Sequence, residues 1–174
     1  MSLLSLLPWA LLAVLVFWAV GAYNRLVGLR AVIRRRFGPI DQQLAARSVL
    51  LLQLIDGLAH EPEVAAHDLE ALRAARSQAN SALDVARARP SSAESIKALR
   101  VAMQILVEAR KRLTGVPKAP EHQPLVAELA ACDNALRFAQ DQFNDAVQEY
   151  NAAVSQFPTG LLATVFQFRG AMPI

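Results

Sequence analysis

The sequence has little cysteine and little glycine. Cys132 is the only cysteine among 174 residues, which excludes an intrachain disulfide and a metal cage made of thiolates. The 7 glycines form neither a Gly-x-Gly-x-x-Gly nor a Gly-x-x-x-x-Gly-Lys-[Ser/Thr] motif, so phosphate-binding loops of these two kinds are excluded. Charge is absent from residues 1–24, although the whole chain has 18 basic and 15 acidic side chains.

The uncharged N-terminal stretch predicts a transmembrane helix. Between Leu3 and Ala22 only Ser5 has a polar side chain. Twenty helical residues at 1.5 Å each span a hydrocarbon core of about 30 Å. Trp18 and Tyr23 lie toward its C-terminal end, as interfacial aromatic residues do. We therefore interpret residues 1–24 as a membrane anchor.

A cleaved signal peptide is the alternative interpretation of this stretch. Val20-Gly21-Ala22 is a tolerable cleavage context. However, no positive region precedes the apolar run, and the run exceeds the usual 7–15 residues of a signal peptide. The anchor is therefore favoured.

Arginines follow the apolar run directly. Five of them come before the first acidic residue, Asp41: Arg25, Arg30, Arg34, Arg35 and Arg36. Positive flanks stay on the cytoplasmic side, so we expect the N-terminus outside and the remaining chain in the cytoplasm. The same cluster could attract anionic lipid headgroups. Beyond residue 40 the net charge is 13 − 15 = −2, so we expect no nucleic-acid binding.

The rest of the chain predicts an all-α fold. Prolines separate segments rich in helix-forming residues, with helices expected from the membrane to about His60, over 63–88, from a Ser91–Glu94 capping box onward, and over 121–157. Gly38-Pro39 is expected to interrupt the first of them. Apolar side chains recur at heptad spacing. We expect a coiled-coil-like, antiparallel, up-down-up-down four-helix bundle over 25–158.

The unequal helix lengths predict a membrane-proximal stalk. The second and third helices are too short to reach the bilayer, so residues 23–36 and 145–157 should pair alone. Such a pair cannot bury all of its apolar residues, which favours self-association. The apolar tail, residues 159–174, is expected to dock at the membrane interface or to cover the base of this stalk.

Asparagines in the predicted stalk each follow an aromatic residue. They are Asn24, Asn144 and Asn151. We interpret them as a hydrogen-bonding set that fixes the register between the first and last helices; a binding site is the alternative.

Catalytic and metal-binding motifs are missing. The sequence contains neither Glu-x-x-His nor His-Glu-x-x-His. His60, Glu63 and His67 lie close in sequence, but Pro62 breaks the helical spacing that a shared metal would need. Cys132 falls on an apolar seam and is read as a structural thiol. We expect no catalytic residue, metal or cofactor.

Three stretches of the chain resemble the LemA family of bacterial membrane proteins. They are Tyr23-Asn24-Arg25-Leu26-Val27; Ile40-Asp41 with Gln43-Leu44, Arg47 and His60-Glu61; and Phe143-Asn144, Val147, Tyr150-Asn151 and Phe157-Pro158. The chain departs from the family pattern at Phe37, at Leu50–Leu54 and at Gln140, so it resembles a divergent member. The resemblance implies an anchored antiparallel helical bundle without an assigned enzymatic activity.

Together these features predict a non-enzymatic, single-pass protein of the bacterial cytoplasmic (inner) membrane that acts as a structural or interaction scaffold. An unidentified protein partner is expected. The alternative is a lipid-binding or membrane-shaping homo-oligomer. An enzyme with an unrecognised site is a third hypothesis.

Overall fold

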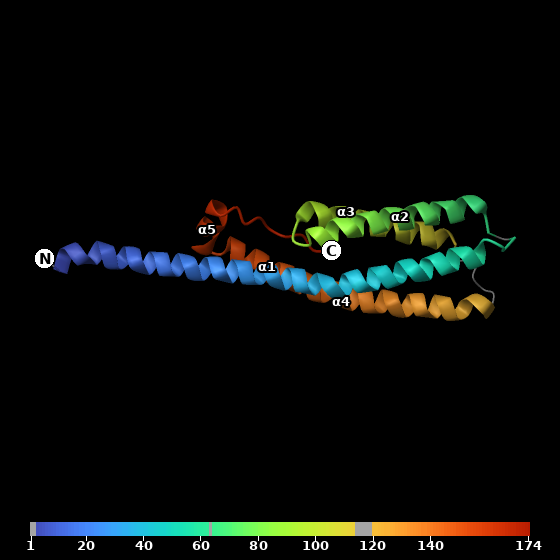
Figure 1. Ribbon diagram of the computed structural model, residues 1–174, viewed down its shortest axis with the longest axis horizontal. Coiled ribbons are helices and arrows are strands. Elements are labelled where there is room, and N and C mark those ends of the chain that lie inside the picture. Colours follow the sequence, from blue (N-terminus) through green and yellow to red (C-terminus); the bar gives the residue numbers. More distant parts are fainter. Residues whose placement is uncertain (1–2, 63, 114–119) are drawn as a thin grey trace.

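The computed structural model describes residues 3–62, 64–113 and 120–174, and over these residues the chain is all-helical with no strand (Figure 1). The helices are α1 (Leu3–Leu58), α2 (Ala66–Ala88), α3 (Ala93–Arg112), the short 3₁₀ helix η1 (Pro120–His122), α4 (Gln123–Ser155) and α5 (Thr159–Val165). The second and fourth long helices are therefore slightly shorter than the sequence predicts.

The molecule is a rod with α1 as its spine. Figure 1 shows α4 lying along α1, while α2 and α3 form a hairpin over the half of the rod where α1 ends. We call this half the distal half. We call the part nearer the N-terminus the base; it comprises residues 23–36 of α1 and 145–155 of α4. The segment after α5 runs back along the base toward the α2–α3 hairpin.

The helices pair through the predicted heptads. Buried side chains along α1 include Leu26, Ile33, Phe37, Ile40, Leu44, Leu51, Leu54 and Leu58, and those along α4 include Leu129, Leu136, Phe143 and Tyr150. The core clusters of the rod combine these residues with apolar side chains of α2 and α3. Two residues of the predicted seven-residue series are exceptions. Tyr23 begins the series on α1 and Phe157 ends the series that runs along α4, and both side chains are exposed.

Pro39 does not interrupt α1, contrary to the sequence-based expectation. The helix continues through Gly38 and Pro39 to Leu58, and Figure 1 shows only a shallow bend in this part of the ribbon. Proline inside a helix removes one backbone hydrogen bond and costs about 3 kcal/mol. Phe37 and Ile40, buried on either side of Pro39 against α4, oppose that cost.

The start of α3 also differs from the predicted capping box. The N-cap is Ser92 rather than Ser91, and no side-chain cap bond is formed there. Ser95 instead donates to the carbonyl oxygen of Arg89 at 2.7 Å. Ser91 accepts a hydrogen bond from Nε of Arg30 at 3.1 Å, which ties the α2–α3 turn to the base.

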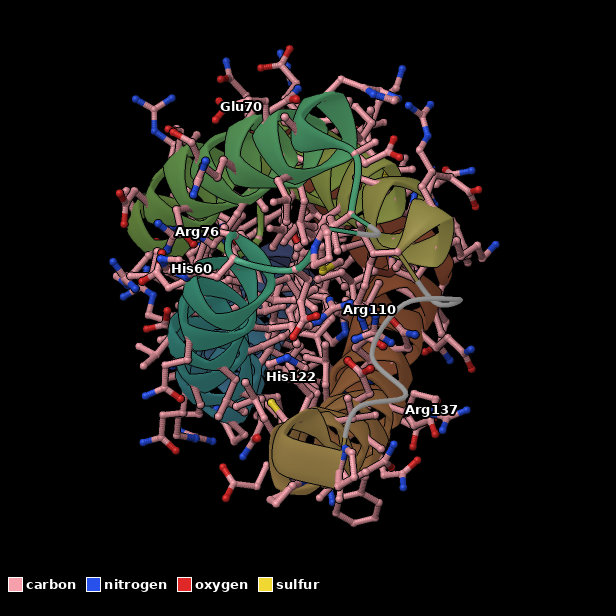
Figure 2. All side chains as sticks on the ribbon, turned by 90° about the vertical axis from the view of Figure 1, so that its right-hand side faces the viewer. His60, Glu70, Arg76, Arg110, His122 and Arg137 are labelled. Atoms are coloured by element: carbon pink, nitrogen blue, oxygen red, sulfur yellow. The ribbon has the colours of Figure 1, made fainter. Side chains whose placement is uncertain are left out.

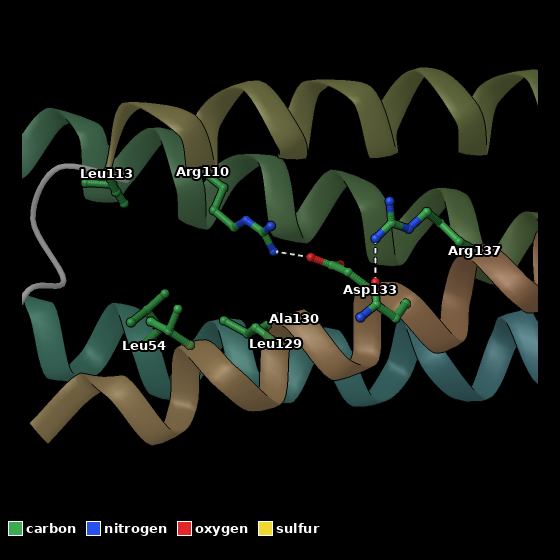
Figure 3. A pocket seen from close by; sticks show the side chains of 9 residues that line it. Leu54, Arg110, Leu113, Leu129, Ala130, Asp133 and Arg137 are labelled. Atoms are coloured by element: carbon green, nitrogen blue, oxygen red, sulfur yellow. Dashed lines mark hydrogen bonds and ion pairs between the residues drawn. The ribbon is translucent and has the colours of Figure 1, made fainter.

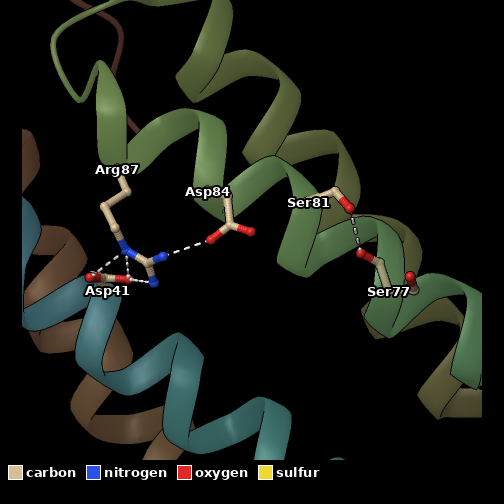
Figure 4. A network of polar contacts seen from close by, with 5 residues as sticks. All are labelled: Asp41, Ser77, Ser81, Asp84 and Arg87. Atoms are coloured by element: carbon tan, nitrogen blue, oxygen red, sulfur yellow. Dashed lines mark hydrogen bonds and ion pairs between the residues drawn. The ribbon is translucent and has the colours of Figure 1, made fainter.

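Polar contacts hold α2 against α1. Arg87 of α2 pairs with Asp41 of α1 at 2.6 Å and with Asp84 of its own helix at 2.6 Å (Figure 4). These contacts raise the pKa of Arg87, chiefly through its hydrogen bond and charge interaction with Asp41. Further along, Arg76 donates to the hydroxyl of Ser48 at 3.0 Å. Both contacts fix the position of the α2–α3 hairpin relative to α1.

Candidate functional site

Arginines surround α1 at the base. Arg25, Arg30, Arg34, Arg35 and Arg36 are all exposed. Successive helical residues are about 100° apart around the axis, so these side chains point in several directions rather than along one face. Arg36 donates to Oε1 of Gln142 on α4 at 2.5 Å, and Arg30 reaches the α2–α3 turn. The base therefore has a collar of positive charge.

An exposed apolar surface precedes this collar. From Leu7 to Val20, the large hydrophobic side chains of α1 are 38–78% exposed, and they include Trp9, Phe17 and Trp18. Among the described residues, α1 is the helix long and apolar enough to cross a membrane by length and composition. Phe166 of the C-terminal segment lies beside Val16, Ala19 and Val20 of this surface.

Two asparagines of α4 hold the C-terminal segment. Nδ2 of Asn151 donates to the carbonyl oxygen of Ala171 at 2.8 Å, and Oδ1 of Asn151 accepts from the amide of Ala171 at 2.8 Å. Asn144 binds Ile174 in the same way, with distances of 3.3 Å to the carbonyl oxygen and 2.9 Å from the amide. Each asparagine amide therefore satisfies both backbone groups of one residue. We call this pair the asparagine clamp.

The spacing of the clamp matches an extended chain. Seven helical residues rise about 10.5 Å at 1.5 Å each, and three extended residues cover about 10 Å. Asn144 and Asn151 are therefore separated by the same length as Ile174 and Ala171. The contacts join α4 to the C-terminal segment and not to α1, so the predicted role of the asparagines in α1–α4 register is wrong.

Aromatic side chains complete the attachment of this segment. Tyr150 is 1% exposed, and its hydroxyl donates to the carbonyl oxygen of Arg169 at 3.0 Å. Burial raises the pKa of Tyr150, and the nearby charge of Arg30 opposes the rise only partly. The ring of Tyr23 lies edge-on to Phe166 and Phe168, with centroid distances of 5.1 and 5.6 Å. The segment is thus fastened to both α4 and α1.

Helix α5 turns Leu161 and Val165 outward. Thr159 and Ala163 are buried against the base, whereas Leu161 is 64% and Val165 73% exposed. A groove of about 280 Å³ lies between Phe166 and the apolar part of α1, lined also by Val16, Ala19, Val20 and Tyr23. The exposed face of α5 therefore lies at the level where the apolar surface of α1 meets the arginine collar.

The residues predicted for the stalk are only partly brought together. Phe143, Asn144, Tyr150 and Asn151 lie in one cluster with the C-terminal segment. Tyr23 joins them through its ring contacts with that segment. Three others do not take part: Asn24 is exposed on α1, Phe157 is 80% exposed, and Pro158 is exposed after a cis peptide bond.

These contacts agree with one of the two expectations for the apolar tail, that it covers the base, but sequence reasoning did not identify which residues of the tail make them. Phe168, Ala171, Met172 and Ile174 pack on the core of the base. The available signal was the seven-residue spacing of two asparagines on one helix, which suits an extended ligand. The segment covers part of the seam between α1 and α4, whereas Tyr23 and Val27 of the base remain 40% and 44% exposed.

A second polar cluster lies inside the distal half. Arg47 of α1, 4% exposed, contacts Oδ1 of Asp133 at 3.0 Å, and Arg110 of α3 contacts Oδ2 at 2.8 Å. Burial lowers the pKa of Arg47, and the charge of Arg110 acts in the same direction, whereas Asp133 opposes them. Figure 2, a view from the distal end, shows Arg110 directed inward.

Cys132 lies next to this cluster in an apolar seam. Its thiol contacts the carbonyl oxygen of Gln43 at 3.2 Å. Burial raises the pKa of the thiol, and the charge of Asp133 adds to the rise while that of Arg47 opposes it. A thiol held in its neutral form is a poor nucleophile, which agrees with the structural role predicted for it.

The two described histidines of the sequence group His60, Glu63 and His67 do not form a site with buried side chains. Glu63 lies outside the described residues, and His60 and His67 are both exposed. Within the described residues, no group of three His, Cys, Asp or Glu side chains could hold a metal ion.

Comparison with protein families decides the relationship of this chain. The model of the LemA family matches residues 36–172, which include most of α1 beyond the apolar part, all of α2 to α5 and the C-terminal segment as far as Met172. The chain belongs to the LemA family. Its match to the LemA pattern thus extends through Asn144, Asn151 and Ala171. A search of curated proteins finds no match.

Proposed function

We propose that this LemA protein is a non-enzymatic, single-pass membrane scaffold. In this proposal the exposed apolar part of α1 crosses the cytoplasmic membrane of a bacterium. The described helices α1 to α4 then form an antiparallel four-helix bundle that binds an unidentified protein partner in the cytoplasm. The single observation that carries the proposal is the exposed apolar surface from Leu7 to Val20, continuous with the buried spine of the rod.

Burial in a bilayer explains that surface. Exposed apolar area in water costs roughly 25 cal/mol per Å², and the apolar stretch is as long as a hydrocarbon core is thick. The arginine collar begins where the stretch ends. Because positive flanks remain cytoplasmic, the N-terminus would lie outside and the bundle inside.

The outer face of the α2–α3 hairpin supports a docking role. Val101 and Ile105 are 46% and 41% exposed on α3. They line a shallow groove of about 430 Å³ that also includes Ala71 of α2. Such a surface, far from the proposed membrane, offers an apolar patch with charged neighbours to a protein partner.

Extraction and a reporter fusion test the anchor and its direction. Alkaline carbonate should leave the wild-type chain in the membrane, while a Val14→Arg/Phe17→Arg double variant should be released. A control with Val101→Arg, on α3, should remain in the membrane. A reporter after Ile174 should be active only in the cytoplasm. Release of the wild-type chain, or activity only outside, would contradict the proposal.

Photocrosslinking tests the scaffold role. Val27 lies at the base and is 44% exposed, so a photoreactive residue there would face neighbouring proteins. A defined adduct with a different protein supports a scaffold for that partner. A ladder of self-adducts supports the homo-oligomer instead, and no adduct from Val27 or from Ile105 would contradict both forms of protein association.

A lipid-binding or membrane-shaping homo-oligomer is the second candidate. The outward apolar face of α5, beside the arginine collar, favours it because such a face suits the interfacial zone of a bilayer. Replacing Leu161 and Val165 with serine should then weaken association with anionic vesicles of a chain that lacks residues 1–24. Unchanged association would count against this candidate.

A further inference from the structure

The distal half contains an open cleft between α3 and α4. Among the described helices, α1 packs on α4 and on α2, and α2 packs on α3. The backbones of α3 and α4 lie farther apart, although Leu99 of α3 and Leu136 of α4 share one core cluster. Side chains of both helices line two adjoining hollows of about 250 and 460 Å³. Arg110, Asp133 and Arg137 line both hollows, and the ion pair between Arg110 and Asp133 lies across the cleft from α3 to α4 (Figure 3).

Positive charge exceeds negative charge in this cleft. Arg47, Arg110 and Arg137 line it, and Asp133 is the one acidic side chain among the described residues that do so. Asp133 contacts the first two arginines at 3.0 and 2.8 Å. Arg137 donates to the neutral amide oxygen of Asn134. One carboxylate thus faces three guanidinium groups, leaving a local excess of two positive charges.

Hydrogen-bond donors also exceed acceptors. Nε of Arg47 and Nη1 of Arg110 are buried, and despite their ion pairs with Asp133 neither makes a well-oriented hydrogen bond within the described structure. A buried donor without a good acceptor costs about 1–3 kcal/mol. A second carboxylate could accept from the accessible part of Arg110, whose side chain is 30% exposed, and from the exposed Arg137, in the paired geometry that arginine favours.

The smaller hollow extends this charged part into an apolar pocket. Leu54, Leu113, Val126 and Leu129 line it beside Arg110. Since a water molecule occupies about 30 Å³ of liquid, a hollow of about 250 Å³ suits a ligand of roughly eight non-hydrogen atoms. A ligand matched to both parts has one anionic end and a short aliphatic chain.

We propose that the α3–α4 cleft binds a small aliphatic monocarboxylate. Its carboxylate pairs with Arg110 and Arg137, and its chain lies among Leu54, Leu113 and Leu129. This site is distinct from the base and does not depend on the scaffold role. A loss of membrane anchoring would therefore leave it intact.

Calorimetric titration of the full chain in lipid nanodiscs tests the site. The probes are hexanoate, hexan-1-ol, acetate and inorganic phosphate. Hexanoate should bind saturably at one site and at least tenfold more tightly than each of the other three. Hexan-1-ol binding as tightly would exclude a role for the arginines, and equal binding of acetate or phosphate would exclude the apolar pocket.

Variants locate the binding. Arg110→Gln should weaken hexanoate binding by about tenfold or more, as expected for loss of a hydrogen bond between charged groups. Arg100→Gln, an exposed arginine on the same helix, is the matched control and should bind as the wild type does. Wild-type binding by Arg110→Gln would overturn the proposal.

A second variant tests the site even if Arg110→Gln does not fold. Val126 is half-buried in the apolar pocket, so Val126→Asp places a repelling carboxylate there without removing an ion pair. This variant should lose hexanoate binding while its thermal unfolding remains cooperative. Retained hexanoate affinity in a folded Val126→Asp variant would overturn the proposal on its own.

Discussion

The α1–α4 pair is covered in two different ways along its length. In the distal half, α2 and α3 cover it with buried leucines such as Leu72 and Leu99. At the base, an extended segment covers it through the asparagine clamp and the hydroxyl of Tyr150. A helix satisfies its own backbone, so side-chain packing suffices. An extended segment on a helical surface needs side-chain partners for its backbone groups.

This difference predicts that the two halves respond differently to mutation. A core mutation in the distal half should leave a cavity and lower the stability of the whole rod. A mutation of the clamp at the base should leave backbone polar groups unpaired. This would release the C-terminal segment and leave the helices folded.

The largest expected effect is Leu72→Ala. Leu72 is fully buried between α2 and its neighbours, and Leu→Ala in a core costs about 2–5 kcal/mol. Chemical unfolding of the solubilised full chain should show this loss in the free energy of unfolding. Val101→Ala, at a half-exposed position of α3, is the control and should cost less than about 1 kcal/mol. Equal effects of both would contradict the described core.

Asn151→Leu should act locally at the base. It removes both contacts with Ala171 and leaves the backbone groups of that residue without their partners, at about 1–3 kcal/mol for each buried group. Hydrogen exchange at the amide of Ala171 should accelerate strongly while helix content, measured by circular dichroism, stays constant.

Asn24→Leu is the matched control for this variant, because Asn24 is an exposed asparagine of the base. It should leave the exchange at Ala171 unchanged. Protection of Ala171 that survives Asn151→Leu would show that packing alone holds the segment.

Tyr150→Phe should have a smaller effect. It removes one hydrogen bond to Arg169 and keeps the buried ring, so we expect a loss of about 1 kcal/mol at neutral pH. The raised pKa of Tyr150 adds a pH dependence. The unfolded chain releases its phenol proton first, near pH 10, so the wild type loses stability as pH rises above that value.

The Tyr150→Phe variant has no phenol at this position, so it should lose less stability between pH 9 and pH 11 than the wild type. Unfolding curves at several pH values measure the difference. Parallel pH profiles would mean that Tyr150 ionises equally easily in the folded and unfolded chains.

The smallest effect concerns reactivity rather than stability. Burial raises the pKa of Cys132, so its alkylation by iodoacetamide at pH 8 should be slow. A Cys132→Ser/Ser81→Cys variant, with its thiol on the exposed face of α2, should react faster. In denaturant the two chains should react at similar rates. Fast alkylation of folded wild-type protein would contradict the seam position of Cys132.

The heptad spacing of apolar residues predicted which side chains of α1 and α4 are buried between the helices. The heptads of α1 and α4 identified Leu26, Ile33, Phe143 and Tyr150 as seam residues, and all four are buried. The path of the C-terminal segment was not predictable in this way, because an extended chain on helices leaves no repeat. The capping-box spacing to Glu94 pointed to Ser91 as the N-cap, whereas the structure uses the adjacent Ser92.

Local rules failed where tertiary packing was stronger. Gly38-Pro39 normally ends a helix, yet Phe37 and Ile40 hold the chain in register on both sides. The asparagines were recognised as a set because each follows an aromatic residue, but their partner lies 20 or 30 residues further along the chain. The sequence predicted this surface and gave the tail as one possible cover for it, but it did not predict which residues join the two.

The unbroken course of α1 has a mechanical consequence. From Arg25 to Leu58 the helix extends about 50 Å, with α4 alongside as a brace. In the proposed membrane arrangement, a rod of this kind would act as a lever whose pivot lies at the bilayer. A tilt of about 10° in the anchoring segment, of the size that a change in bilayer thickness produces, would swing the far tip through roughly 9 Å. The far tip would then report strain in the surrounding lipid without any change in the fold.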